Sequence, residues 1–141
     1  MALSANRALS RRNEAGMLVR KATVATSQTI YKHALVVMKN AGTSCKVAAN
    51  ETTTNFLGLS DAQYSAASTA KCYTNLEVSI PFTTGVTAGN WGALAYATDD
   101  EKVTTAATLG PPVGIFLEID ADNSANVWVH LGQMTALGNA S

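Results

Sequence analysis

Val113-Gly-Ile-Phe-Leu-Glu-Ile119 and Val127-Trp-Val-His-Leu131 are two apolar segments that flank a polar turn at residues 120–126. The second segment alternates apolar and polar residues, which is the period of a strand with one buried face. The first is an almost continuous apolar run of a length typical of a buried strand. The Asp- and Asn-rich stretch between them favours a turn, because these side chains hydrogen-bond to nearby backbone. The pattern predicts two β-strands joined by a turn.

Similar segments occur through the rest of the chain. Alternation or β-branched composition predicts strands at residues 23–31, 34–38, 45–49, 56–59, 76–80, 93–97 and 102–105. Short strands at such regular spacing are typical of a sandwich or barrel. We therefore expect an all-β fold, a small β-barrel or β-sandwich. One short helix is expected near residues 61–71, because Ser60 and Gln63 have the spacing of a capping box.

An internal repeat relates the two parts of this strand pattern. A shift of 56 positions places Lys46-Val47 on Lys102-Val103 and Gly58 on Gly114. Both copies then have a short strand, a polar turn, a Thr-rich link and an apolar-Gly-apolar segment. A glycine inside a strand often marks a bulge or a close backbone approach. We expect two similar halves, at about residues 35–80 and 91–132, within one β-domain at residues 23–141.

Length and composition limit the class of protein. The 141 residues suit one domain. Cys45 and Cys72 are too few for a disulfide framework and lack the spacing of metal ligands. No run reaches the roughly 18 apolar residues that a membrane span needs. No apolar segment follows the basic N-terminal residues as it would in a signal peptide. We expect synthesis in a reducing cytoplasm and no membrane partner.

Charge is segregated along the chain, although the net charge is zero. The first 46 residues carry eight Lys and Arg against Glu14 alone, and the other 95 carry two Lys against nine acids. Residues 1–22 are interpreted as a basic, extended N-terminal arm. Such a segment indicates an acidic partner: a protein surface, the acidic half of a neighbouring copy, or nucleic acid. Alternatively, its charges only keep it solvated. Nucleic acid is disfavoured, because single-strand binders need aromatic stacking platforms and Tyr31 is the only aromatic residue there.

The sequence predicts no catalytic residue, no metal site and no cofactor. His33 and His130 lie outside any recognisable catalytic triad context, and His130 is expected on the outward face of a strand. The acidic stretches at residues 99–101 and 120–123 lack the loop of an EF-hand. They are interpreted as turns, with a bound cation as the alternative. The glycines do not form a phosphate-binding loop.

The two tryptophans are the largest apolar anchors. Trp91 lies in the loop-like stretch Gly89-Asn-Trp-Gly92, where a large aromatic side chain often anchors an interface. Core packing is the equal alternative for Trp91. Trp128 is expected in the core.

The chain resembles a family of phage capsid decoration proteins, also called cement proteins. The resemblance is carried by Val86-Thr-Ala-Gly89, Leu94-Ala-Tyr-Ala-Thr-Asp-Asp100, Lys102-Val-Thr-Thr105, Pro112-Val-Gly-Ile115 and Val127-Trp-Val-His-Leu-Gly132. It covers roughly residues 35–132. The chain departs from the family pattern by its longer basic N-terminal extension and a polar insertion at residues 61–75.

The resemblance implies a β-barrel-like fold, a homotrimer, a place on the outside of the virion and no catalysis. The partner is then the major capsid protein, whose neighbouring subunits the chain would bridge. The expected contact residues are the five basic residues of the arm and one tryptophan: Arg7, Arg11, Arg12, Arg20, Lys21 and Trp91.

Two other functions remain as alternatives. A head-fibre or receptor- and glycan-binding module would need an exposed aromatic and polar cluster, for which Trp91 is the candidate centre. A nucleic-acid-binding protein would act through the basic arm.

Overall fold

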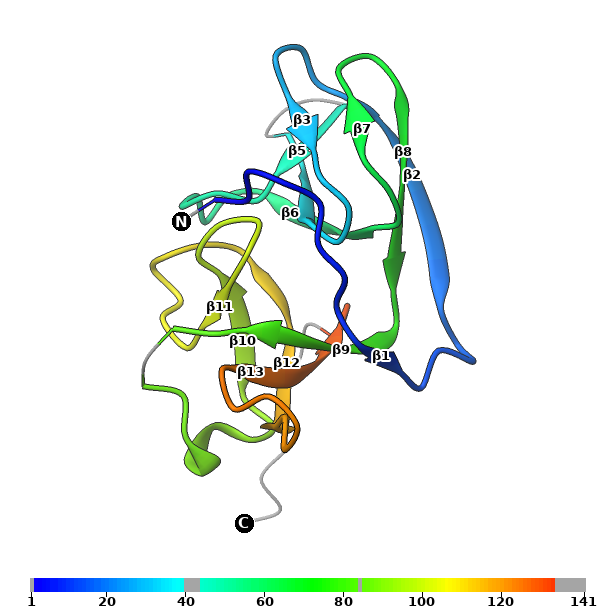
Figure 1. Cartoon of the computed structure of the whole chain (residues 1–141). Coiled ribbons are helices and arrows are strands. Elements are labelled where there is room, and N and C mark those ends of the chain that lie inside the picture. The colour runs from blue at the N-terminus through cyan, green and yellow to red at the C-terminus, as the bar shows by residue number, and fades with distance from the viewer. Residues whose placement is uncertain (1, 40–43, 84, 134–141) are drawn as a thin grey trace.

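The computed structural model describes residues 2–39, 44–83 and 85–133, and it confirms the all-β prediction. Figure 1 shows two lobes of strands, one above the other. Residues 18–74 form the first lobe and residues 76–131 the second. The N-terminal segment at residues 2–17 lies across both lobes (Figure 1).

The first lobe is a closed five-stranded barrel in the order β2-β5-β4-β6-β8. Its strand β2 pairs with β8 along its length but with β5 only at Thr23 and Val24. Strands β3 and β7 form a separate two-stranded ribbon. The strands are β2 (Leu18–Val24), β3 (Thr29–Ile30), β4 (Leu35–Met38), β5 (Ser44–Val47), β6 (Asn55–Ser60), β7 (Tyr64–Ser65) and β8 (Thr69–Thr74).

The second lobe is a sheet in the order β1-β9-β13-β12-β10-β11. A parallel bridge between Phe82 and Val103 joins the end of β9 to β11, so this sheet also curls back on itself. Its elements are β1 (Arg11–Arg12), β9 (Leu76–Pro81), the 3₁₀ turn η1 (Ala88–Asn90), β10 (Leu94–Ala97), β11 (Val103–Thr104), β12 (Pro112–Ile119) and β13 (Asn126–Leu131).

The two lobes have the same strand order, which confirms the expectation of two similar halves. Strands β5-β4-β6-β8-β2 of the first lobe correspond to β11-β10-β12-β13-β9 of the second. The parallel contact of Val24 with Cys45 corresponds to that of Phe82 with Val103. The halves therefore begin earlier than the predicted 35–80 and 91–132, because β2 opens the first and β9 the second. The division at residues 22 and 23 falls inside β2.

The repeated glycines have the same role in both lobes. Gly58 pairs with Val36 and Gly114 with Ala95, and a β-bulge follows each pairing. A Cβ atom on Gly58 would lie 2.7 Å from the carbonyl oxygen of Tyr73. A Cβ atom on Gly114 would lie 2.1 Å from that of His130. Both strands need glycine because a neighbouring backbone passes too close for a side chain.

The repeat does not hold at one constant shift. Lys46 pairs with Val37, the β4 residue just past the bulge in the neighbouring β6. Thr104 pairs with Tyr96, the β10 residue just past the bulge in the neighbouring β12. Lys46 thus corresponds to Thr104, and its predicted match with Lys102 is wrong. The connections between strands differ in length in the two lobes, so the sequence shift changes from strand to strand.

The short helix expected near residues 61–71 is wrong. These residues form β7, a turn and the first part of β8. Along β8, Ala70, Cys72 and Thr74 are buried and alternate with more exposed residues. This period of two suits a strand over a core, and burial overrides the local capping pattern.

A shared core joins the lobes into one unit. Its main cluster contains Leu35, Val37 and Leu59 of the first lobe together with Val78 and Phe116 of the second. All five are completely buried. A smaller cluster around Ile30 and Val36 fills the outer end of the first lobe.

Candidate partner-binding surface

The Arg7 side chain is held by hydrogen bonds within the chain. Its guanidinium donates to the carbonyl oxygens of His33 at 2.9 Å, Glu101 at 2.7 Å and Asp100 at 3.1 Å. Burial lowers the pKa of Arg7 to about 10, with Asp100 and Glu101 opposing the shift. The group stays charged at neutral pH and ties the N-terminal segment to both lobes.

His33 lies in the first lobe and accepts a hydrogen bond from the same N-terminal segment. Its Nδ1 atom accepts the backbone N–H of Leu9 at 2.9 Å, and its backbone has a positive φ of 60°. Burial lowers the pKa of His33 to about 4, helped by Arg11, Lys32 and Arg7 and opposed by Asp61. The ring is therefore neutral near pH 7, as an acceptor must be.

The second lobe has a glycine where the first has His33. The N–H of Gly92 donates to Phe116, as that of His33 donates to Ser60, and Gly92 also has a positive φ of 87°. Glycine adopts this backbone conformation without strain. A histidine in the same place costs conformational energy, and its side chain compensates by holding the N-terminal segment.

Arg11 and Arg12 form β1, and the Arg12 side chain fastens this strand to the second lobe. Arg12 Nε lies 2.6 Å from Glu77, and its Nη2 lies 2.6 Å from Glu118. The same guanidinium lies 4.1 Å above the ring of Trp128. Arg11 pairs with Glu14 at 2.9 Å and lies 5.8 Å above the ring of Tyr73. Both arginines are thus neutralised within the chain.

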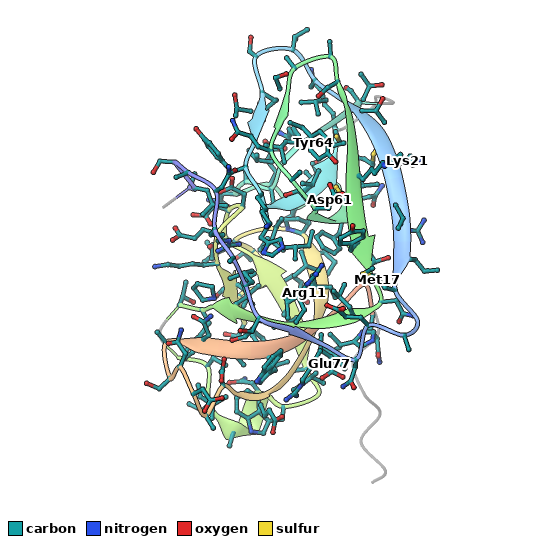
Figure 2. All side chains as sticks on the ribbon, turned by 45° about the vertical axis from the view of Figure 1, so that its right-hand side comes forward. Arg11, Met17, Lys21, Asp61, Tyr64 and Glu77 are labelled. Atoms are coloured by element: carbon teal, nitrogen blue, oxygen red, sulfur yellow. The ribbon has the colours of Figure 1, made fainter. Side chains whose placement is uncertain are left out.

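Arg20 and Lys21 differ from the other predicted contact residues, because both are exposed and neither has an ion pair within the described residues. Lys21 points away from the barrel on the outer side of β2 (Figure 2). It pairs directly with Lys71 of β8, which is also exposed. Leu18 and Val19 beside them are 50% and 51% exposed. Arg20 pairs with the buried Cys72 and therefore lies on the opposite face of β2 from Lys21. We call Lys21 and Lys71, which share one face, the basic strip.

The sequence did not single out Lys71. It lies 50 positions from Lys21 in a stretch expected to be helical, and only the pairing of β2 with β8 brings the two together. Its one signal in the sequence is the alternation of β8, in which Lys71 falls between the buried Ala70 and Cys72.

Trp91 is not an exposed anchor. It is partly buried and packs against the main core cluster. Trp128 is also only partly buried, because it lies on the outer face of β13 and is covered by Arg12. The expectation that Trp128 lies in the core is wrong for this reason. His130 lies on that outer face, as its strand alternation predicts.

The acidic stretches form turns, as predicted. The Asp99 carboxylate accepts the backbone N–H groups of Glu101 at 2.8 Å and Lys102 at 3.1 Å. Asp120 accepts that of Asp122 at 2.9 Å. Among the described residues, no group of three or more His, Cys, Asp or Glu is arranged to hold a metal ion.

The two cysteines lie in the interior of the first lobe. Cys45 and Cys72 are buried, and burial raises the pKa of both thiols, so neither is an activated nucleophile.

A shallow hollow beside the basic strip is lined by Arg20, Met38, Phe56, Leu57, Thr74 and Gly132. A second one adjoins it at Leu18 and His130. Across residues 2–39, 44–83 and 85–133, no helix has the length and apolar character to cross a membrane.

Comparisons of the chain with models of known families, with curated proteins and with solved structures find no match.

Proposed function

We propose that the chain is a structural virion protein that binds the outside of a phage capsid and bridges neighbouring capsid subunits. The resemblance of residues 35–132 to capsid decoration proteins supports this function. The observation that carries it is the basic strip, in which Lys21 faces Lys71 beside the exposed Leu18 and Val19. Like charges directly opposite each other on a sheet are destabilising, and an acidic partner would remove that cost.

The proposed contact surface includes only some of the basic residues of the predicted N-terminal arm. Arg7, Arg11 and Arg12 are held by the chain's own carbonyl and carboxylate groups. Arg20 lies on the opposite face of β2 from Lys21. The proposed contact residue of the arm is therefore Lys21, with Lys71 added. Trp91 is left out because it packs on the core. This burial also leaves the alternative of a receptor- or glycan-binding module without its central residue.

The proposed action is mechanical. Apolar area buried between shell and decoration stabilises by roughly 25 cal/mol per Å² before ordering costs. A protein that binds the assembled lattice and not the free subunits shifts the equilibrium toward the lattice. A trimer and the major capsid protein as partner belong to the same proposal.

Co-sedimentation with empty shells of the phage that encodes the chain tests the proposal. The double variant Lys21→Glu with Lys71→Glu is expected to lose most of its binding to the shells. A matched control, Lys39→Glu with Lys102→Glu, makes the same change in net charge at lysines outside the strip and is expected to bind normally.

Equal binding of both variants would contradict a contact through the basic strip. Failure of the wild-type chain to sediment with shells, together with binding to free DNA that weakens steeply with salt, would favour a nucleic-acid function instead. Deletion of residues 2–22 is unsuitable as a test, because it removes most of β2 from the barrel.

A further inference from the structure

We propose that the open edge of β2 receives an extended acidic segment of a partner protein, which adds to the barrel as an antiparallel strand. The inference deepens the proposed function and rests on it for the partner being a capsid subunit. It is drawn from the comparison of equivalent strands in the two lobes.

Strand β9 of the second lobe shows how such an edge is filled. On its outer side β1 adds as an antiparallel strand, with Arg11 opposite Val78 and Arg12 opposite Glu77. The N–H of Ser79 donates to the carbonyl of Ser10 at 2.9 Å. Further along, the bridge from Phe82 to β11 closes the sheet.

The equivalent edge of β2 is filled only at its far end. Thr23 and Val24 pair with β5, but within the described residues no strand pairs with residues 18–22 on that side. Val19 pairs with Tyr73 as Glu77 pairs with His130, so Val19 corresponds to Glu77. Among residues 2–39, 44–83 and 85–133, no segment occupies on β2 the place that β1 occupies on β9.

The backbone of β2 presents hydrogen-bonding groups to this opening. The N–H of Val24 donates to Ser68 at 2.8 Å on the β8 side, and that of Ala25 donates to Cys45 at 2.9 Å on the β5 side. Because these groups alternate along a strand, the N–H groups of Val19 and Lys21 face the open side. Unpaired strand edges are templates for the addition of another chain.

Charge indicates which kind of segment fits. At the filled edge, Arg12 of β1 pairs with Glu77 and Glu118. At the open edge the signs are reversed, because β2 carries Arg20 and Lys21 beside Lys71. An incoming acidic strand would neutralise the basic strip, and the hollow at Met38 and Phe56 offers an apolar side chain a place to pack. Leu9 packs on the core in this way just before β1.

Amide hydrogen exchange followed by NMR tests the inference on the full chain. The probe is a synthetic peptide with the sequence of residues 8–13 in which both arginines are replaced by glutamate. The control peptide has the unchanged sequence of residues 8–13. In the free chain, the amides of Val19 and Lys21 are expected to exchange quickly, while those of Arg20 and Ala22, which face β8, are protected.

Addition of the acidic peptide is expected to protect Val19 and Lys21, with a Kd on the order of 1 mM for so short a strand. The control peptide is expected to have no effect. Val19→Pro removes the edge N–H group and should abolish the effect, whereas Val19→Thr should retain it. Should Val19→Pro fail to fold, Lys21→Glu provides the second variant, with an expected tenfold or greater loss of affinity.

Three results would overturn the inference. The first is no protection at about 10 mM peptide. The second is protection of Val19 and Lys21 in the isolated monomer, which would mean that another segment of the chain covers the edge. The third is protection that rises with protein concentration, which would identify a second copy as the occupant.

Strand addition at β2 and the proposed function can fail independently of each other. Binding to shells without protection of Val19 and Lys21 would retain the function and overturn strand addition. Protection by the peptide without binding to shells would retain the edge site and overturn the function.

Discussion

His33 joins the N-terminal segment to the first lobe through one neutral acceptor atom. In the folded chain its pKa is about 4, against an ordinary value of 6.5. The unfolded chain therefore binds a proton between these pH values and the folded chain does not. By linkage, this contribution to stability is complete above pH 6.5 and is lost as the pH falls toward 4.

The free energy of unfolding should fall by about 2–3 kcal/mol between pH 7 and pH 4 through this group. His33→Asn provides the matched control, because asparagine tolerates a positive φ and its amide oxygen accepts a hydrogen bond without titrating. Urea unfolding across this pH range should give a flatter profile for the variant. Identical pH profiles for the two proteins would contradict the role of His33.

Gly114 is a second position where one residue decides local structure. A Cβ atom there would lie 2.1 Å from a backbone oxygen, and backbone cannot rotate away as a side chain does. Gly114→Ala should lower the free energy of unfolding by about 3 kcal/mol or more. The control Gly89→Ala meets nothing closer than 3.8 Å and should change stability by less than about 1 kcal/mol. Equal stability of the two variants in thermal unfolding would refute the close approach of β12 and β13.

At the scale of elements, β1 is a two-residue strand that depends on its side chains. Two hydrogen-bonded residues cannot hold a strand in place by themselves, and Arg12 adds two ion pairs and a contact with the ring of Trp128. The exposed part of β2 differs from β1, because its basic residues Arg20 and Lys21 have no ion pairs within the described residues.

Arg12→Ala should lower the free energy of unfolding by about 1–2 kcal/mol, through loss of the cation–π contact and the ion-pair network. Arg20→Ala, on the exposed part of β2, should stay within about 0.5 kcal/mol of the wild type. Urea unfolding of both variants measures this difference. A larger effect of Arg20 than of Arg12 would be inconsistent with the described roles.

Most elements could be predicted from the sequence, but their partners could not. The alternation at residues 127–131 and the apolar runs at residues 34–38 and 113–119 identify strands directly. The segment at residues 61–71 misleads because its capping spacing is local, whereas the burial that makes β8 a strand comes from distant residues. Lys71 joins the candidate surface only through pairing with a strand 50 positions earlier.

At the scale of the whole molecule, the basic N-terminal residues serve the fold before they serve a partner. Basic residues are concentrated in the first part of the sequence, but some of them are neutralised within the fold. Arg7 donates a hydrogen bond to a carbonyl oxygen of the second lobe, and Arg12 forms an ion pair with Glu77 there. The segment crosses from one lobe to the other and fastens both (Figure 1). The sequence shows the charge and cannot show where the chain itself neutralises it.

Deletion of residues 2–17 should therefore destabilise the whole protein while leaving β2 in the chain. Because the lobes share a core, we expect one cooperative unfolding transition at a lower temperature, by about 5 °C or more. Differential scanning calorimetry measures both quantities. An unchanged melting temperature would mean that the segment is a dispensable arm.

The orientation of the protein on its particle is the most direct test of the proposed function. A reconstruction of the decorated capsid at a resolution that separates strands would locate both lobes against the shell. We expect the outer face of β2 and β8, with Lys21 and Lys71, to lie against capsid subunits. A reconstruction in which this face points to solvent, or in which the chain is absent from the shell, would contradict it.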